Sequence, residues 1–216
     1  MSRPSHPFWG ADSPLSALSA VALIVMASGR LSFALICSAA LLWVYGFTSL
    51  TFFGARSILP AKGAIVVLLF LASFFSGLFA ILLSVVNPLL FLGTGFLLVL
   101  IPPCCLGSGL FQNSKMSSVD DAFPRAMVDA VTLSGIIIAF SLIREPLGMG
   151  TLSIPGGIHG VMEITGSGEQ GLFFPVRFLS VSAGALVLLG YGTAIFRYFR
   201  ERGGNTPIDG IGEDGK

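Results

Sequence analysis

The stretch AIVVLLFLASFFSGLFAILLSVVNPLLFLGTGFLLVLIPPCC, residues 64 to 105, contains no charged side chain. A helix needs about 20 apolar residues to cross the hydrocarbon core of a bilayer, which is roughly 30 Å thick. Ala64 to Val86 is long enough for one crossing, and Pro88 to Cys105 is short for a second. The stretch therefore predicts an integral membrane protein that contains these two segments as helices.

The composition of the whole chain agrees with this class. Of its 216 residues 54% are hydrophobic and 11% are charged, and the mean hydropathy is +0.88. The net charge of +1 argues against nucleic acid as a partner, because phosphate binding needs a concentrated basic face. The first fifteen residues are polar, so we expect no cleavable signal peptide. We expect membrane lipid to be the surroundings of most of the chain.

Six apolar segments are candidates for membrane helices, and the first and fourth are short. They run from Leu15 to Ser28, Leu31 to Phe53, Ala64 to Val86, Pro88 to Cys105, Ala126 to Ile143 and Phe178 to Tyr198. We expect an all-α integral membrane fold with an N-terminal segment (1–14), a six-helix membrane domain (15–198) and a solvated tail (199–216). One short span followed by two longer ones occurs twice, which indicates two inverted three-helix repeats.

The basic residues favour one orientation in the membrane. With a cytoplasmic N-terminus, nine Lys and Arg residues fall on the inside and three, Arg30, Arg144 and Arg177, on the outside. Cytoplasmic loops carry an excess of Lys and Arg in membrane proteins. We therefore expect both termini to be cytoplasmic.

Proline and glycine predict where two of these helices end. We expect the fourth helix to break at Pro102 and Pro103, because proline lacks an amide hydrogen and restricts the residue before it. We expect Pro146 and Gly148 to stop the fifth helix just after Arg144 and Glu145. The glycine-rich segment from Gly148 to Pro175 then reads as a long external loop with pieces that lie on the surface.

Ionisable residues near membrane depth are candidates for function because burying them is expensive. Arg125 and Asp129 lie four residues apart and can pair on one face of a helix. Arg144 and Glu145 fall at the far end of the same segment, where an interfacial turn would explain them. His6 and His159 have no ligand-like neighbours in the sequence, so we expect no metal role for either.

The cysteines have two interpretations. A buried thiol is usually a small apolar side chain, and Cys37 in its apolar segment fits that role. Cys104 and Cys105 follow the double proline, where a helix break would expose amides that stabilise thiolates or cluster sulfurs. A [2Fe-2S] centre needs four ligands, so it would have to recruit cysteines from elsewhere in this chain or from a partner.

The segment SLIREPLGMGTL, Ser141 to Leu152, resembles the membrane subunits of Rnf and Na⁺-translocating NADH:quinone reductase complexes. The match is to the L-R-E-x-x-G-x-G-T-L pattern of the RnfE/NqrD branch. Asp129 is similar to the aspartate that opens the same helix in that family. Cys105 with Gly109 resembles the family's N-C-x-x-x-G motif, and Gly95 keeps the branch's spacing to Cys105.

The resemblance implies six helices in two inverted halves and a homologous partner subunit of opposite topology in the bacterial cytoplasmic (inner) membrane. It also implies a mid-membrane [2Fe-2S] cluster shared with that partner, to which each subunit gives one cysteine from its first helix and one from its fourth. Flavin-bearing and iron-sulfur-bearing subunits complete such complexes, which couple electron transfer to Na⁺ or H⁺ translocation. Cys105 would be the ligand on this chain.

Two departures from the family pattern concern the cluster. The first-helix cysteine should fall at about Ala22, and alanine cannot ligate iron. Cys104 stands where the family has asparagine. Cys104 or Cys37 would have to serve instead, with altered pairing, if a cluster is held.

Three functions remain open from the sequence. The first is a non-catalytic subunit of an Rnf/Nqr-type complex that contributes Cys105 to an intramembrane cluster. The second is a divergent paralogue with a structural or assembly role and no cluster. The third is an independent transporter built on inverted repeats, with Asp129 or Glu145 as the coupling carboxylate and Arg144 beside the ion path.

Overall fold

The computed structural model describes residues 14–54, 64–107, 119–156, 160–165 and 177–203 of the chain. Its long helices are α2 (Leu31–Gly54), α3 (Ala64–Val86), α4 (Pro88–Gly107) and α6 (Val119–Met149), preceded by the shorter α1 (Pro14–Ala27). A hairpin of β1 (Leu152–Pro155) and β2 (Val161–Thr165) follows, and then α7 (Arg177–Ser180) and α8 (Ser182–Gly203). The fold is mainly helical, as the sequence predicts.

Among the helices that the structure describes, four are apolar and long enough to cross a membrane. Their candidate spans are Leu31–Phe52, Val66–Val86, Pro88–Cys105 and Ala126–Met149. In α1 the helix has only 14 residues, and the apolar part of α8 is the shorter stretch Ser182–Ile195. The helices are consistent with the predicted membrane class, and the six-helix count stays a prediction.

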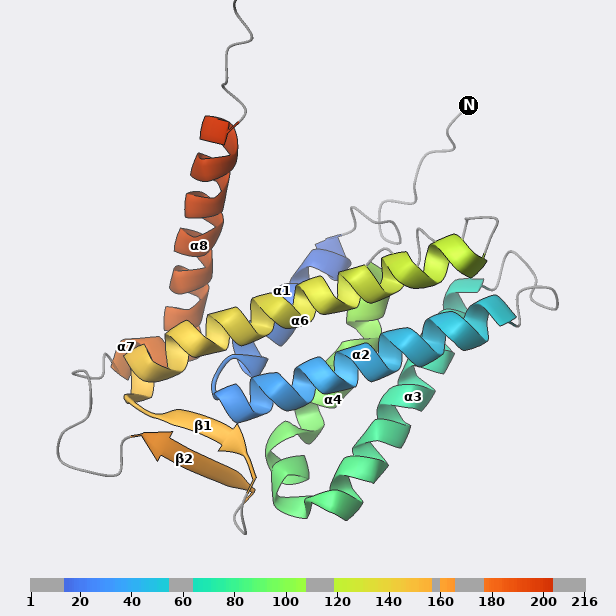
Figure 1. The fold of residues 1–216 in the computed structure, drawn as a ribbon, viewed down its shortest axis with the longest axis horizontal. Coiled ribbons are helices and arrows are strands. Elements are labelled where there is room, and N and C mark those ends of the chain that lie inside the picture. Colours follow the sequence, from blue (N-terminus) through green and yellow to red (C-terminus); the bar gives the residue numbers. More distant parts are fainter. Residues whose placement is uncertain (1–13, 55–63, 108–118, 157–159, 166–176, 204–216) are drawn as a thin grey trace, which may run out of the picture.

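The helix α2 lies between α6 and α3, with α4 behind it in the view of Figure 1. It packs most extensively on α6 along one side, and α3 and α4 form a hairpin on the other. In its membrane span 61% of the residues are buried, against 22% for α3. Tyr45 and Leu41 of α2 pack with Leu68 of α3, Leu98 of α4 and Ile137 of α6 in the main core.

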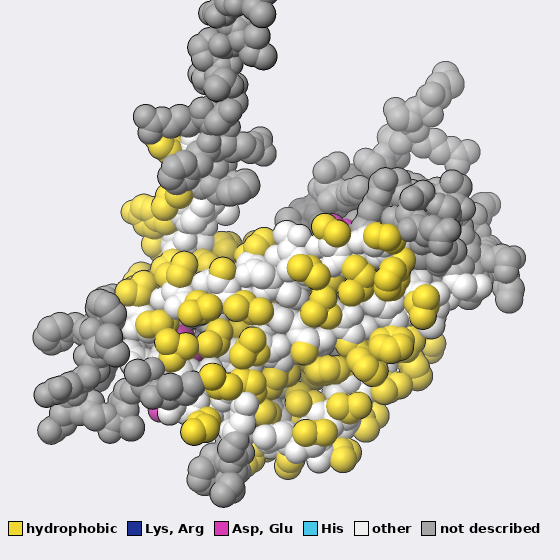
Figure 2. All heavy atoms as spheres, in the orientation of Figure 1, with side chains coloured by type: hydrophobic (Ala, Val, Ile, Leu, Met, Phe, Trp, Pro, Cys, Tyr) yellow, Lys and Arg dark blue, Asp and Glu magenta, His cyan; other side chains and the backbone are white. Residues whose placement is uncertain are grey.

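The outward faces of these helices are apolar. Figure 2 shows hydrophobic side chains spread over the face of the bundle that carries α2 and α6. On α3 the exposed side chains include Phe70 and Phe74, and on α4 they include Leu92 and Phe96. Exposing so large an apolar surface to water is unfavourable, whereas contact with lipid chains is not. The exposed apolar side chains and the hydropathy of the helices thus both indicate lipid as the surroundings of the bundle.

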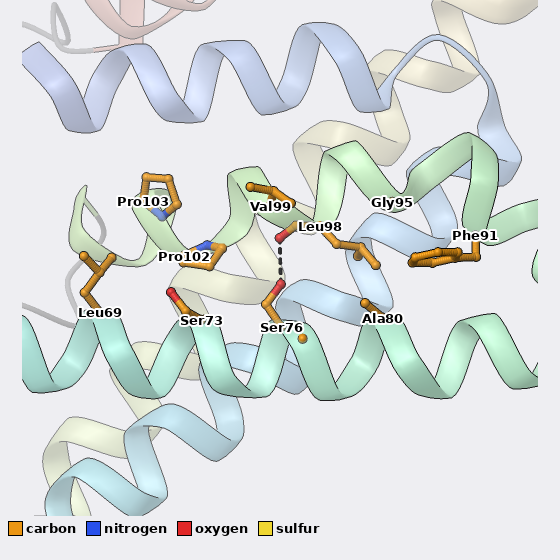
Figure 3. A pocket seen from close by; sticks show the side chains of 11 residues that line it. Leu69, Ser73, Ser76, Ala80, Phe91, Gly95, Leu98, Val99, Pro102 and Pro103 are labelled. Carbon is orange, nitrogen blue, oxygen red and sulfur yellow. Dashed lines mark hydrogen bonds between the residues drawn. The ribbon is translucent and has the colours of Figure 1, made fainter.

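The expected break at the double proline is wrong. The helix α4 continues through Pro102 and Pro103 to Gly107. Since Pro102 has no amide hydrogen for the Leu98 carbonyl four residues earlier, that carbonyl needs another donor. The Ser76 hydroxyl of α3 donates to it at 2.6 Å (Figure 3). A tertiary hydrogen bond therefore replaces the missing bond of the helix.

The fifth predicted segment also ends later than expected. The helix α6 runs through Pro146 to Met149, beyond Arg144 and Glu145. The helix ends where Gly150 adopts a positive φ of 69° and its amide donates to the Pro146 carbonyl at 3.0 Å. Glycine accepts this left-handed conformation without the penalty that a Cβ would bring.

The first part of the predicted external loop forms the β-hairpin instead. The two strands are antiparallel, with Ser153 opposite Glu163 and Pro155 opposite Val161. Ser153 is buried against the N-terminal end of α2, while Ile154 is exposed. The hairpin thus covers one end of the bundle (Figure 1).

Candidate functional site

Two groups of residues singled out from the sequence can be placed in the structure. The first group is the cysteines, in α2 and α4. Cys37, Cys104 and Cys105 form no disulfide bond, and each is at most 3% exposed. All three belong to the main hydrophobic core. The Tyr45 hydroxyl donates to the Cys104 carbonyl at 3.2 Å, which ties α2 to the last turn of α4.

The three thiols lie in the interior of the chain and not at its surface. A shared cluster requires sulfur atoms at a surface that the partner can reach, and Cys105 is fully buried in the core of its own chain. Ala22, in α1, is partly buried and offers no ligand atom. Within the described ranges, no three His, Cys, Asp or Glu side chains gather as a metal group. The positions fit small apolar side chains in a helical core.

The second group is the buried pair at the end of α6. Arg144 is 4% exposed, and its guanidinium lies where α1 and α7 end. Its Nη1 donates to the Val25 carbonyl at 2.7 Å and to the Ser28 hydroxyl at 2.9 Å. Its Nε and Nη2 donate to the carbonyls of Leu179 and Ser180 at 2.9 and 3.0 Å. One side chain thus holds the C-terminal ends of two helices.

This placement is electrostatically favourable. The last carbonyls of a helix lack partners within the helix and carry the negative end of its dipole. A guanidinium has five N–H donors in a planar fork, so it can bind several such carbonyls at once. The contacts of Arg144 therefore explain its burial without a bound anion or a paired carboxylate.

Glu145 has the complementary role at the start of α2. Its Oε2 accepts the Leu31 amide at 2.6 Å, and the side chain is 1% exposed. Leu31 is the first residue of α2, where unpaired amides and the positive end of the helix dipole favour a carboxylate. Within the described residues, Glu145 Oε1 has no hydrogen-bond partner. Neighbouring residues in α6 thus cap helix ends of opposite polarity.

Serines complete this junction. Ser153 of β1 lies beside the Glu145 carboxylate, and its hydroxyl donates to the Ser32 hydroxyl at 3.3 Å. The Ser32 amide donates to the same Ser153 oxygen at 3.4 Å. Sequence reasoning missed Ser28, Ser32 and Ser153. Their only local signal is a small polar residue next to an apolar span, and that signal is common.

The remaining candidates are less informative. Asp129 lies on α6 and is partly buried, and it makes interactions with its surroundings. Its predicted pairing with Arg125 stays a prediction, because the Arg125 side chain lies outside the described part of the structure. His6 and His159 also lie outside the described residues.

Asp129 is some four helical turns from Glu145 along α6, at about 1.5 Å per residue. The two carboxylates therefore do not form one site. The structure brings together Arg144, Glu145 and the serines, while the three thiols lie in the main hydrophobic core.

Comparison with known proteins finds no family model that matches this chain and no curated protein that matches it.

Proposed function

We propose that this chain is a membrane-embedded, non-catalytic subunit of an Rnf/Nqr-type complex that couples electron transfer to Na⁺ or H⁺ translocation. One observation carries the proposal. The segment Ser141 to Leu152, on which the resemblance depends, supplies Arg144 and Glu145 to the junction of α1, α2 and α7. Two residues of this motif, Arg144 and Glu145, therefore make contacts that hold the helices of the bundle together.

The proposal includes the finer topology. Six helices cross the membrane in two inverted halves, with both termini cytoplasmic in a bacterial inner membrane. The first and fourth spans, α1 and α4, are the short ones, and the last helix, α8, needs neighbours from outside the chain. In support, the main contacts of α8 with other described elements are those with α7 and α1. The helix projects away from the bundle (Figure 1).

The neighbour that α8 needs is a homologous subunit of opposite topology. Leu186, Val187 and Ile195 on α8 are each about half exposed, at 52%, 48% and 55%. Tyr191, at 68%, is exposed as well. Helices in lipid associate through close packing and interhelical hydrogen bonds, and α8 offers Gly190 and Ala194 one turn apart for close approach. The flavin-bearing and iron-sulfur-bearing subunits would join this pair.

Within such a complex, we assign the chain a structural or assembly role. The burial of Cys37, Cys104 and Cys105 in the chain's own core favours this role over ligation of an intramembrane [2Fe-2S] cluster. Cys105 is the thiol that the resemblance would make a ligand, so it is the residue to test.

Purification of the complex through an affinity tag on this chain tests the proposal. We expect membrane subunits and redox subunits to co-purify and to be identified by mass spectrometry. Iron content and the [2Fe-2S] electron paramagnetic resonance signal should be unchanged in Cys105→Ser and in the matched control Cys37→Ser. Loss of the signal in Cys105→Ser alone would establish a ligand role and overturn the structural assignment.

A different result would overturn the subunit proposal itself. If the chain purifies without partners and transports Na⁺ or H⁺ in liposomes, it is an independent transporter. Glu145→Gln and Asp129→Asn would then identify the coupling carboxylate.

A further inference from the structure

Two buried polar atoms of α6 have no hydrogen-bond partner among the residues that the structure describes. They are Oε1 of Glu145 and Oγ of Ser141, and the two side chains are 1% and 0% exposed. Other helical hydroxyls bond within their own helix, as those of Ser38 and Thr132 do to the carbonyl four residues earlier. The Ser141 hydroxyl makes no such bond, so both atoms need a partner of another kind.

We infer that one water molecule is bound between Glu145 Oε1 and Ser141 Oγ. The two residues are four apart on one face of α6, where Cβ atoms lie about 5–6 Å from each other. Side chains of a helix tilt toward its N-terminus, so Glu145 extends over the turn that carries Ser141. A water that bonds to two oxygens at about 2.8 Å each can connect atoms up to about 5.6 Å apart.

The surroundings place this water between α6 and α2. Glu145 Oε2 accepts the Leu31 amide at the start of α2, at 2.6 Å. Further along the same side of α6, the Ser134 hydroxyl donates to the Ser38 carbonyl of α2 at 3.4 Å. Ser141 lies between these two contacts in the sequence of α6. The water would therefore fill a polar position within the interface of the two helices.

The chemistry of the position favours water over a metal ion. Metal ions that bind protein oxygens take about six ligands, and only two unpartnered oxygens are available here. The charge of the Glu145 carboxylate is already matched by the Leu31 amide and by Arg30, which interacts with it electrostatically. A further cation would add buried positive charge without a partner. Water is neutral, donates to the carboxylate, and needs only two to four polar partners.

Radiolytic footprinting of the full chain in phospholipid nanodiscs tests the inference. A short X-ray pulse converts water, including bound water, into hydroxyl radicals that oxidise adjacent side chains, and mass spectrometry locates the oxidised residues. One reporter is Ile137, one turn before Ser141, and its matched reference is Ile101 of α4; both are 0% exposed. The second reporter is Leu31, 8% exposed, with Leu83, 9% exposed, as its reference. We expect each reporter to be oxidised several-fold more than its reference.

Ser141→Ala removes one of the two partners of the water. It should therefore lower the oxidation of Ile137 and Leu31 to the level of their references. The matched control is Ser134→Ala, which removes another buried hydroxyl from α6 and should leave both reporters unchanged. If Ser141→Ala does not fold, Ser141→Cys replaces it, because a thiol is only a weak hydrogen-bond partner.

Three results would overturn the inference. Reporters oxidised no more than their references would mean that no water is bound beside them. An excess that both Ser141 variants keep would mean that the water, if bound, does not use this hydroxyl. An excess that changes when choline replaces Na⁺ and K⁺ in the buffer would mean that a cation occupies the position. None of these results depends on whether redox subunits co-purify, so the inference and the proposed function can fail separately.

Discussion

Replacing Ser76 with alanine removes the hydroxyl that donates to the Leu98 carbonyl at 2.6 Å. Pro102 has no amide hydrogen for that carbonyl, so the variant leaves it without this donor in apolar surroundings. Hydrogen bonds between membrane helices contribute about 0.6 kcal/mol on average and up to about 1.7 kcal/mol. Because this bond is short and replaces a missing helix bond, we expect Ser76→Ala to lower the free energy of unfolding by about 1.5 kcal/mol.

A second substitution tests the reason for this loss. In a Pro102→Ala background, residue 102 regains an amide hydrogen that can donate to the Leu98 carbonyl within the helix. Ser76→Ala should then lower the free energy of unfolding by less than about 0.5 kcal/mol. The double-mutant cycle should therefore give a coupling of about 1 kcal/mol between positions 76 and 102.

The measurement is equilibrium unfolding in mixed micelles of dodecyl maltoside and sodium dodecyl sulfate. The matched control is Ser84→Ala on the same helix, where the hydroxyl donates to the Ile81 carbonyl at 2.7 Å within α3. This control should change the free energy of unfolding by less than about 0.5 kcal/mol. An equal loss for Ser76→Ala in both backgrounds would refute the argument that the serine replaces the proline's missing donor.

Three further predictions concern the buried polar and thiol groups. Arg144→Lys should lower the free energy of unfolding by about 2–4 kcal/mol, because an ammonium cannot reach all four oxygen atoms that accept from the guanidinium. The control is Ile143→Met at the neighbouring exposed position, and an equal loss in both variants would contradict this prediction. Glu145→Gln keeps an acceptor for the Leu31 amide, whereas Glu145→Leu does not. In the same measurement, the Gln variant should therefore lose about 1 kcal/mol less free energy of unfolding than the Leu variant. Maleimide should label Cys37 and Cys105 only after unfolding, as followed by mass spectrometry, and rapid labelling of Cys105 in the folded protein would mean that it faces a surface.

The helices were predictable where a single local property decides them. The predicted bounds of α3, Ala64 to Val86, are those observed, because an uninterrupted apolar run leaves few alternatives. The end of α4 was not predictable, since proline is a local signal for a break and the donor that offsets it comes from Ser76 on another helix. The β-hairpin was missed because four or five residues in a glycine-rich segment give too little periodicity to count.

The site was predictable only in part. Charge at membrane depth drew attention to Arg144 and Glu145, and the structure shows both of them buried. Their partners at Val25, Leu31 and Leu179 contribute backbone groups, which carry no side-chain signature in the sequence. A backbone carbonyl is identical at every residue, so only the fold can identify which ones a guanidinium binds.

The contacts of Arg144 also have a consequence for synthesis. Val25 precedes Arg144 by 119 residues, and a ribosome adds about 5–20 residues per second, so the end of α1 waits roughly 6–24 s for its donor. Leu179 and Ser180 follow another 35 and 36 residues later. The first helix to leave the ribosome is therefore among the last to reach its final position, and a chain truncated before α6 would expose that unfinished end to the quality-control proteases of the membrane.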